Sequence, residues 1–411
     1  MTQSHAEGRA TYARLFAVAE FRALWSAQLL SVLGDQLARV ALTLLVYDRT
    51  RSALLAAITF AASVVPTFVG GVALAGLADR LPRRAVMIGC DLIRAALIAA
   101  MIIPGIPIGV LVLLLFAVTM TGTPFTSARA AIYPEILDGD LYVLGNATAL
   151  TTYQFAQVLG FAAGGAVVLA FGTSTSLMLD AASFLISAVI IRLRVTARPA
   201  ARARASAGRE TGGIRAAVLL VFRTPALRTP MLLGWLAAFY NAPEGVAAPL
   251  ASSLGGGSIG VGLLLAATAL GASVGAVAFG RLVGPDRRAR WMWPLAIATC
   301  GVLVLFALRP SLPLALAILF ASGLFDCYQI AASAAFVRAT PADRRSQAFG
   351  LAQAGMSLGQ GAAMILAGAA VRAYAPETVV AWAGTLGVLA AFLIGVRPTP
   401  GSEHAAGNGT R

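Results

Sequence analysis

The chain has 411 residues, of which 59% are hydrophobic and only 12% are charged. Soluble domains carry about 25% charged residues, so this composition excludes an ordinary soluble protein and indicates a membrane protein. The net charge of +14 comes from arginines in short segments between apolar runs, which the positive-inside rule explains better than a nucleic-acid partner does. The sequence contains no lysine, which excludes a G-x-x-x-x-G-K-[ST] nucleotide loop.

Apolar runs long enough to cross a bilayer recur along the chain. A hydrocarbon core about 30 Å thick requires roughly 20 helical residues. The first run is long and is not followed by a small-residue cleavage site, so we expect it to be retained as a span. We predict twelve spans: 24–47, 53–78, 85–103, 106–125, 147–171, 174–191, 230–251, 258–280, 291–308, 312–335, 347–371 and 377–396.

The distribution of arginine predicts the orientation. With both termini on one side of the membrane, 25 arginines fall on that side and 4 on the other. Both termini and the middle loop are therefore predicted to be cytoplasmic. The boundaries that follow are an N-terminal tail 1–23, a six-helix bundle 24–191, an Arg-rich linker 192–229, a second six-helix bundle 230–396 and a tail 397–411.

The two halves also resemble each other in sequence. A gap-free shift of 204 residues lays Gly71 over Gly275 and Arg83 over Arg287, close to the midpoint of the chain. Agreement among this match, the span count and the linker favours an internal duplication. We therefore predict an all-α polytopic membrane protein of two pseudo-symmetric six-helix bundles.

The segment "ALAGLADRLPRRAVM" lies between the second and third predicted spans. It resembles motif A of the major facilitator superfamily, G-x-x-x-D-R-x-G-R-[RK], although Ala75 and Pro82 stand where that motif has glycine. The phrases "FRALWSAQLLSVLGDQLARVALTLLVYDRT" and "RRAVMIGCDLIRAAL" resemble the twelve-span drug exporter branch, which includes macrolide and siderophore exporters. The resemblance covers essentially the full chain and implies the major facilitator fold.

The resemblance also implies a role for motif A. In this family the motif acid, Asp79 here, docks against the start of span eleven near Gln347 in the outward-facing state and separates from it in the inward-facing state. The second half has Val283 in place of that acid, so only the first half could form such a latch. A charged turn that only sets topology is the alternative. The predicted latch residues are Asp79, Arg80, Arg83, Arg84, Asp91 and Arg94.

Span five contains a second motif-like group, Gly160, Phe161, Gly164 and Gly165. It resembles motif C of proton-coupled exporters, G-P-x-x-G-G, with Phe161 in place of the proline. Small residues four apart also allow helices to pack closely, which is the structural alternative.

Five acids fall in the interior of predicted spans, namely Asp35, Asp91, Asp180, Glu244 and Asp326. A charge at the bilayer centre costs roughly 2.5–3.5 kcal/mol, so such residues are candidates for function. Asp35 and Arg39 are four residues apart on one helix face and either neutralise each other or line a cavity. Asp180 is expected to be a packing residue whose polar atoms are satisfied.

Span seven, "GWLAAFYNAPEGVAAPL", is predicted to be a cavity wall and hinge. Pro243 and Pro249 each remove a backbone donor, and an irregular helix at membrane depth occurs where it lines protein or water. Helical spacing lets Tyr240, Asn241 and Glu244 share a face. In the superfamily, spans one, four, seven and ten line the central cavity, which implies a substrate and proton path of Asp35, Arg39, Tyr240, Asn241, Glu244, Asp326 and Gln329. We hypothesise that Glu244 or Asp326 carries the proton.

These observations predict a secondary active transporter in the inner (plasma) membrane that exports a hydrophobic or amphipathic small molecule by proton exchange. Uptake of a small polar metabolite and a non-transporting scaffold or sensor are the alternatives. We expect a monomer whose partners are its substrate and the lipid bilayer, with the proton gradient as energy source and no cofactor. No enzyme is predicted, because the sequence shows no nucleophile with a base. No metal site is predicted, since His5 and His404 lie in polar tails.

Overall fold

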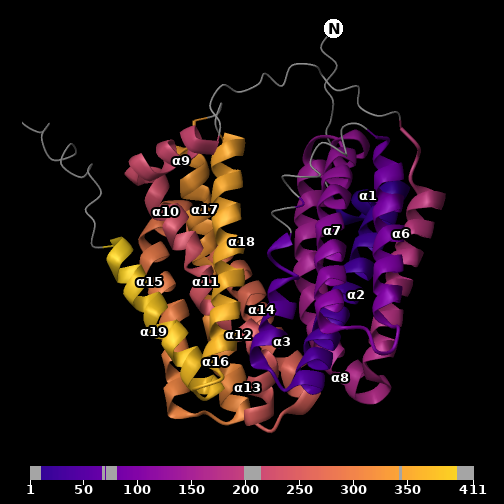
Figure 1. Ribbon diagram of the computed structural model, residues 1–411. Coiled ribbons are helices and arrows are strands. Elements are labelled where there is room, and N and C mark those ends of the chain that lie inside the picture. Colours follow the sequence, from indigo (N-terminus) through magenta and orange to yellow (C-terminus); the bar gives the residue numbers. More distant parts are fainter. Residues whose placement is uncertain (1–10, 67–69, 71–80, 199–213, 342–344, 396–411) are drawn as a thin grey trace, which may run out of the picture. The chain divides into compact units, whose positions relative to one another are not determined.

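The computed structural model describes residues 11–66, 70, 81–198, 214–341 and 345–395 (Figure 1). These residues are mostly helical, and no β-strand occurs among them. Contacts divide the chain into two compact units. Unit 1 comprises Met1–Leu42 and Pro66–Ala205, and unit 2 comprises Thr43–Val65 and Ser206–Arg411.

Unit 1 is built from the short helix α1 (Tyr12–Ala17) and four long helices, which are most of α2 (Ala19–Thr50), α6 (Arg83–Met101), α7 (Ile108–Ile136) and α8 (Gly139–Arg194). Helix α8 contains predicted spans five and six. Its chain reverses at Gly172, where φ is 79° and ψ is 172°. Glycine adopts this backbone conformation without the steric penalty of a Cβ, so Gly172 separates two antiparallel spans within one continuous segment.

One end of unit 1 has a closely packed apolar core. Phe21 at the start of α2 contacts Tyr133 near the end of α7, with ring centroids 5.8 Å apart. Met87 near the start of α6 and Ile191 near the end of α8 belong to the same cluster and are fully buried. Because these residues come from the beginnings of α2 and α6 and the ends of α7 and α8, four helix termini meet at this end. The sequence predicts this end to be cytoplasmic.

Unit 2 contains shorter and more irregular helices. They are α3 (Ala53–Ala61), α9 (Ile214–Arg223), α10 (Pro225–Trp235), α11 (Ala237–Tyr240), α12 (Ala242–Gly245), α13 (Ala247–Ser253), α14 (Gly257–Leu282), α15 (Pro285–Leu303), the 3-10 helix η1 (Val304–Leu308), α16 (Leu312–Phe325), α17 (Tyr328–Ala339), α18 (Arg345–Ala370) and α19 (Pro376–Gly395).

The predicted irregularity of span seven is confirmed. The segment is divided into α10, α11, α12 and α13 by breaks at Leu236, Asn241 and Val246. Pro243 and Pro249 lack a backbone N–H, and each ring clashes with the carbonyl four residues before it. The break at Asn241 lies two residues before Pro243, and the break at Val246 lies three residues before Pro249.

Helices α14 and α16 approach each other through glycine. A Cβ added at Gly275 would meet the backbone of Leu324, and one at Gly323 would meet the backbone of Thr268. Small residues at such crossings allow backbones to pack directly, which is the usual way that helices associate within a bilayer. Figure 1 shows these two helices side by side in unit 2.

The described helices fit a membrane environment. Seven of them are long and apolar enough to cross a bilayer, and a helix lies in each of the twelve predicted spans. Large apolar side chains also face outward: Leu113 is 66% exposed and Leu366 is 70% exposed. Apolar outer surfaces of this kind are stable in lipid.

Candidate functional site

Unit 1 encloses a polar cavity of about 530 Å³ between α2, α6, α7 and α8. Its charged lining residues are Asp35, Arg39, Arg94 and Arg129. The remaining polar lining includes hydroxyls and amides, among them Gln28, Ser31, Thr119, Thr123, Thr126, Asn146 and Tyr153. Three arginines and one acid give this cavity a positive lining.

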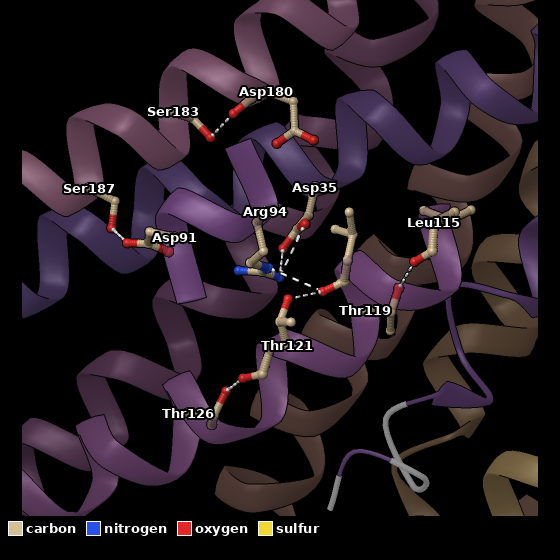
Figure 2. Close-up of polar contacts among 12 residues, drawn as sticks. Asp35, Asp91, Arg94, Leu115, Thr119, Thr121, Thr126, Asp180, Ser183 and Ser187 are labelled. Atoms are coloured by element: carbon tan, nitrogen blue, oxygen red, sulfur yellow. Dashed lines mark hydrogen bonds and ion pairs between the residues drawn. The ribbon is translucent and has the colours of Figure 1, made fainter. Parts of the chain in front are cut away.

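An ion pair joins two helices at this cavity (Figure 2). Arg94 on α6 donates from Nη2 to the two carboxylate oxygens of Asp35 on α2, at 3.2 and 3.4 Å. Its Nε donates to the carbonyl of Val118 on α7 at 3.4 Å, and its Cζ lies 4.3 Å from the ring centroid of Phe184 on α8. Arg94 therefore contacts all three neighbouring helices. The sequence assigned Arg94 to the motif A latch, whereas the structure places it beside Asp35 and Arg39 in the cavity wall.

Two further acids are buried behind this pair. Asp91 on α6 accepts a hydrogen bond of 2.6 Å from Ser187 on α8. Asp180 on α8 is fully buried, and neither of its carboxyl oxygens has a hydrogen-bond partner. The Ser183 hydroxyl donates its proton to the backbone carbonyl of Asp180 at 2.7 Å (Figure 2). The expectation that Asp180 is a satisfied packing residue is therefore not met.

Unit 2 encloses a second cavity, of about 390 Å³, with a different lining. Tyr240, Asn241, Asp326 and Gln329, all predicted path residues, lie together in its wall. The large apolar side chains of the lining are aromatic residues and methionines, including Met231, Trp235, Phe336, Phe349 and Met356. Asp326 is the one charged residue among the described residues that line it.

A hydrogen-bonded triad lies in the wall of this cavity. Tyr240 donates its hydroxyl to Oδ1 of Asp326 at 2.5 Å, and Gln329 donates from Nε2 to the Tyr240 oxygen at 2.8 Å and to the carbonyl of Gly234 at 3.1 Å. Asp326 lies at the break between α16 and α17, and Tyr240 lies at the break after α11. Two interrupted helices thus present their polar groups to the same cavity.

Glu244 differs from the other residues of span seven. It is half-buried in α12 and is not among the residues that line the unit 2 cavity. The expected shared face assumed a continuous helix, but the backbone breaks at Asn241, so helical spacing does not carry the face from Tyr240 to Glu244. The role proposed for Glu244 stays a prediction.

Half of the motif A prediction falls within the described residues. Asp79 and Arg80 lie outside them, so the latch stays a prediction. Arg83 binds near the end of α7, donating to the carbonyl of Ala131 at 2.8 Å and pairing with Glu135. Arg84 donates to the carbonyl of Arg192 near the end of α8. Cations are favoured at helix C-termini, where carbonyl groups lack helical partners.

The glycines of span five pack against α2. A Cβ at Gly160 would lie 2.7 Å from Cβ of Gln36, and one at Gly164 would lie 3.1 Å from Val40. Gly165 and Phe161 are buried in the same helix. The close-packing alternative therefore accounts for Gly160 and Gly164, and a motif C function stays a prediction.

Several cavity residues were not predicted from the sequence. Trp235 donates from Nε1 to the carbonyl of Ala352 on α18 at 2.9 Å, which fixes its ring at the cavity wall. Phe336 and Phe349 line the same cavity. Aromatic residues in apolar helices carry no pattern that separates a cavity wall from a lipid-facing or packed position, and only the tertiary contacts make the difference. No group of three or more His, Cys, Asp or Glu residues that could hold a metal ion occurs among the described residues.

Membrane-length helices that enclose polar cavities, with charged groups facing those cavities, are typical of small-molecule transporters. The chain belongs to the Major Facilitator Superfamily, whose model matches residues 24–243 and 245–410. It is therefore a membrane transporter and not an enzyme, with a fold of two pseudo-symmetric six-helix bundles.

Solved structures share this fold. A POT family transporter in complex with a thioalcohol-conjugated peptide matches with a TM-score of 0.73 and 9% identity, over 92% of this chain and 95% of that one. A bacterial homologue of the human lysosomal transporter Spinster matches with 0.68 and 15% identity, over 96% and 100%. A D-xylose–proton symporter matches with 0.69 and 14% identity, over 93% and 97%. The comparison with curated proteins gives no match.

Proposed function

We propose that this transporter is a proton-coupled exporter of hydrophobic or amphipathic small molecules that acts by alternating access in the plasma membrane, with both termini cytoplasmic. The observation that carries the proposal is the lining of the unit 2 cavity. Aromatic and methionine side chains supply the large apolar groups of its wall, and a half-buried carboxyl group, Asp326, lies among them. Such a wall suits an apolar ligand because methionine and aromatic side chains offer large, adaptable contact surfaces.

We infer that Asp326, and not Glu244, carries the proton. It lines the cavity, and its Oδ1 accepts the Tyr240 hydroxyl. A carboxylate at membrane depth is costly unless it is paired or takes up a proton. No arginine lies among the described residues that line this cavity, so uptake of a proton is the available way to neutralise Asp326.

Uptake of a small polar metabolite is the second candidate. The unit 1 cavity favours it, because that lining is polar and carries Asp35, Arg39, Arg94 and Arg129. A D-xylose–proton symporter shares the fold. This candidate predicts that polar solutes move with the proton, whereas export predicts that apolar compounds move against it.

The deciding experiment uses inverted vesicles that contain the full chain and are acidified inside. A panel of lipophilic dyes and of sugars, nucleosides and dipeptides is tested with and without the pH gradient. Accumulation of a lipophilic compound that collapses with the gradient, and that is lost in Asp326→Asn but retained in Glu244→Gln, supports the proposal. Gradient-driven movement of polar solutes alone supports uptake, and no gradient-dependent movement of any compound supports a non-transporting protein.

A further inference from the structure

Asp180 on α8 lies inside unit 1, and its two carboxyl oxygens have no hydrogen-bond partner. Asp180 has an exposed fraction of 0%, and the hydroxyl of its neighbour Ser183 donates to the backbone carbonyl of Asp180. A buried polar group normally has a partner, and each exception requires an explanation. Proton uptake provides one, because it removes the charge whose burial is costly.

The groups that face Asp180 come from three helices. Helix α2 contributes Asp35 and Arg39, and α6 contributes Arg94; all three line, with Asp180, a small cavity of about 30 Å³. Helix α7 contributes Leu115, Val118 and Thr119, none of which is titratable. The next acid, Asp91, accepts the Ser187 hydroxyl at Oδ2, and its Oδ1 has no hydrogen-bond partner.

Glycine allows α2 to lie directly against this site. A Cβ at Gly34 would meet Oδ1 of Asp180 and Oγ of Ser183. Asp35 follows Gly34 in the sequence, and its carboxyl group lines the same small cavity as that of Asp180. Two carboxylates in a confined site do not both ionise readily, because like charges disfavour the second ionisation.

The arginine that neutralises one acid is within reach of the other. Arg94 is bound to Asp35 through Nη2, and it also lies in the wall of the cavity that contains Asp180. Asp35, Arg39, Arg94 and Thr119 line both this small cavity and the larger polar cavity of unit 1. A proton that leaves Asp180 therefore passes the Asp35–Arg94 pair on its way to the larger cavity.

We propose that Asp180 is a proton-binding site in unit 1, which holds its proton while Arg94 pairs with Asp35 and releases it when Arg94 pairs with Asp180. The step moves one proton from the Asp180 carboxyl group to water in the polar cavity, while Arg94 exchanges one carboxylate partner for the other. The total charge of the site falls by one. Its use in transport rests on the proton coupling proposed above, but the binding of the proton is independent of any substrate.

Infrared spectroscopy of the full-length protein in detergent at neutral pH tests this proposal without a transported compound. A protonated carboxyl group gives a carbonyl stretching band that is separate from the carboxylate bands and shifts in D₂O. We expect wild type to show this band and Asp180→Asn to lose the component from Asp180. Asp326→Asn, a matched change in unit 2, should retain that component.

A second variant tests the exchange with Asp180 intact. Asp35→Asn removes the carboxylate partner of Arg94, so Arg94 should pair with Asp180, and the Asp180 band should be lost although Asp180 is present. A band unchanged in Asp180→Asn, or a band unchanged in Asp35→Asn, overturns the proposal. Should Asp180→Asn fail to fold, the Asp35→Asn result decides alone. Failure of every compound to move in vesicles would refute the proposed export and leave these spectra unaffected.

Discussion

Arg94 on α6 binds both carboxylate oxygens of Asp35 on α2, at 3.2 and 3.4 Å, and rests on the ring of Phe184 on α8. These residues are 59 and 90 positions apart from Arg94 along the chain. One side chain therefore ties three helices of unit 1 together. A buried arginine that loses its partner usually destabilises a protein by about 3–5 kcal/mol.

The Asp35–Arg94 pair predicts an unusual pattern of stability. Asp35→Asn alone should destabilise by less than about 3 kcal/mol, because Asp180 can replace the lost partner. Asp35→Asn with Asp180→Asn should destabilise by clearly more than the two single changes together, because Arg94 then loses both carboxylates of the small cavity that it lines. Thermal unfolding of the four proteins in detergent measures this coupling. Additive changes would contradict it.

The tyrosine of the unit 2 triad predicts a transport defect. Tyr240→Phe removes the hydroxyl that Asp326 accepts, a charge-assisted bond that contributes about 1.5–3 kcal/mol. We expect gradient-driven transport to fall roughly tenfold, the equivalent of about 1.4 kcal/mol. Initial rates in vesicles provide the measurement.

Tyr328→Phe is the matched control for that change. Its hydroxyl donates to the backbone carbonyl of Leu233 at 2.9 Å, and Tyr328 is not among the residues that line the cavity. It should lower stability by about 1 kcal/mol and leave the transport rate nearly unchanged. Equal defects in both variants would show that packing of the tyrosines, and not the bond to Asp326, is what transport requires.

The glycine contact between α14 and α16 predicts strong sensitivity to a single methyl group. Gly323→Ala would press a Cβ against the backbone of Thr268, and overpacking of this kind costs about 1–3 kcal/mol. Gly280→Ala on the partner helix α14 has no atom within 4 Å of the added Cβ and should be neutral or stabilising by up to about 1 kcal/mol. Unfolding temperatures compare the two, and a neutral Gly323→Ala would contradict the packing.

Charged groups at the end of unit 1 predict a salt-sensitive attachment of the chain that follows α8. Arg198 pairs with Glu20 at 2.8 Å and with Glu135 at 3.3 Å, and Glu135 also pairs with Arg83. Exposed ion pairs contribute about 0–1 kcal/mol and are screened by salt. Glu135→Gln should therefore increase hydrogen exchange at residues 195–198, whereas Asp140→Asn, a matched loss of charge at this end, should not. Exchange that is insensitive to both Glu135→Gln and high salt would contradict this role.

The sequence by itself determined the class of structure. Runs of about 20 apolar residues require helices in a bilayer, because an unpaired backbone is too costly in lipid, and a helix occurs within each of the twelve predicted runs. The prolines at 243 and 249 were enough to predict that span seven is broken, since proline removes a local hydrogen bond whatever the surroundings. Motif A was enough to predict the superfamily.

The tertiary structure decided which charges meet. Asp35 has Arg39 four residues away, yet its carboxylate binds Arg94 from another helix, and nothing in the local spacing selects that partner. Asp180 resembles any polar residue in an apolar run until the neighbouring helices are seen to leave it without a donor. The same holds for Trp235 and Phe349, whose place in a cavity wall depends on how α10 and α18 pack. Backbone conformation depends on residues that are adjacent in the sequence, whereas the partners of a side chain depend on helices that meet only after folding.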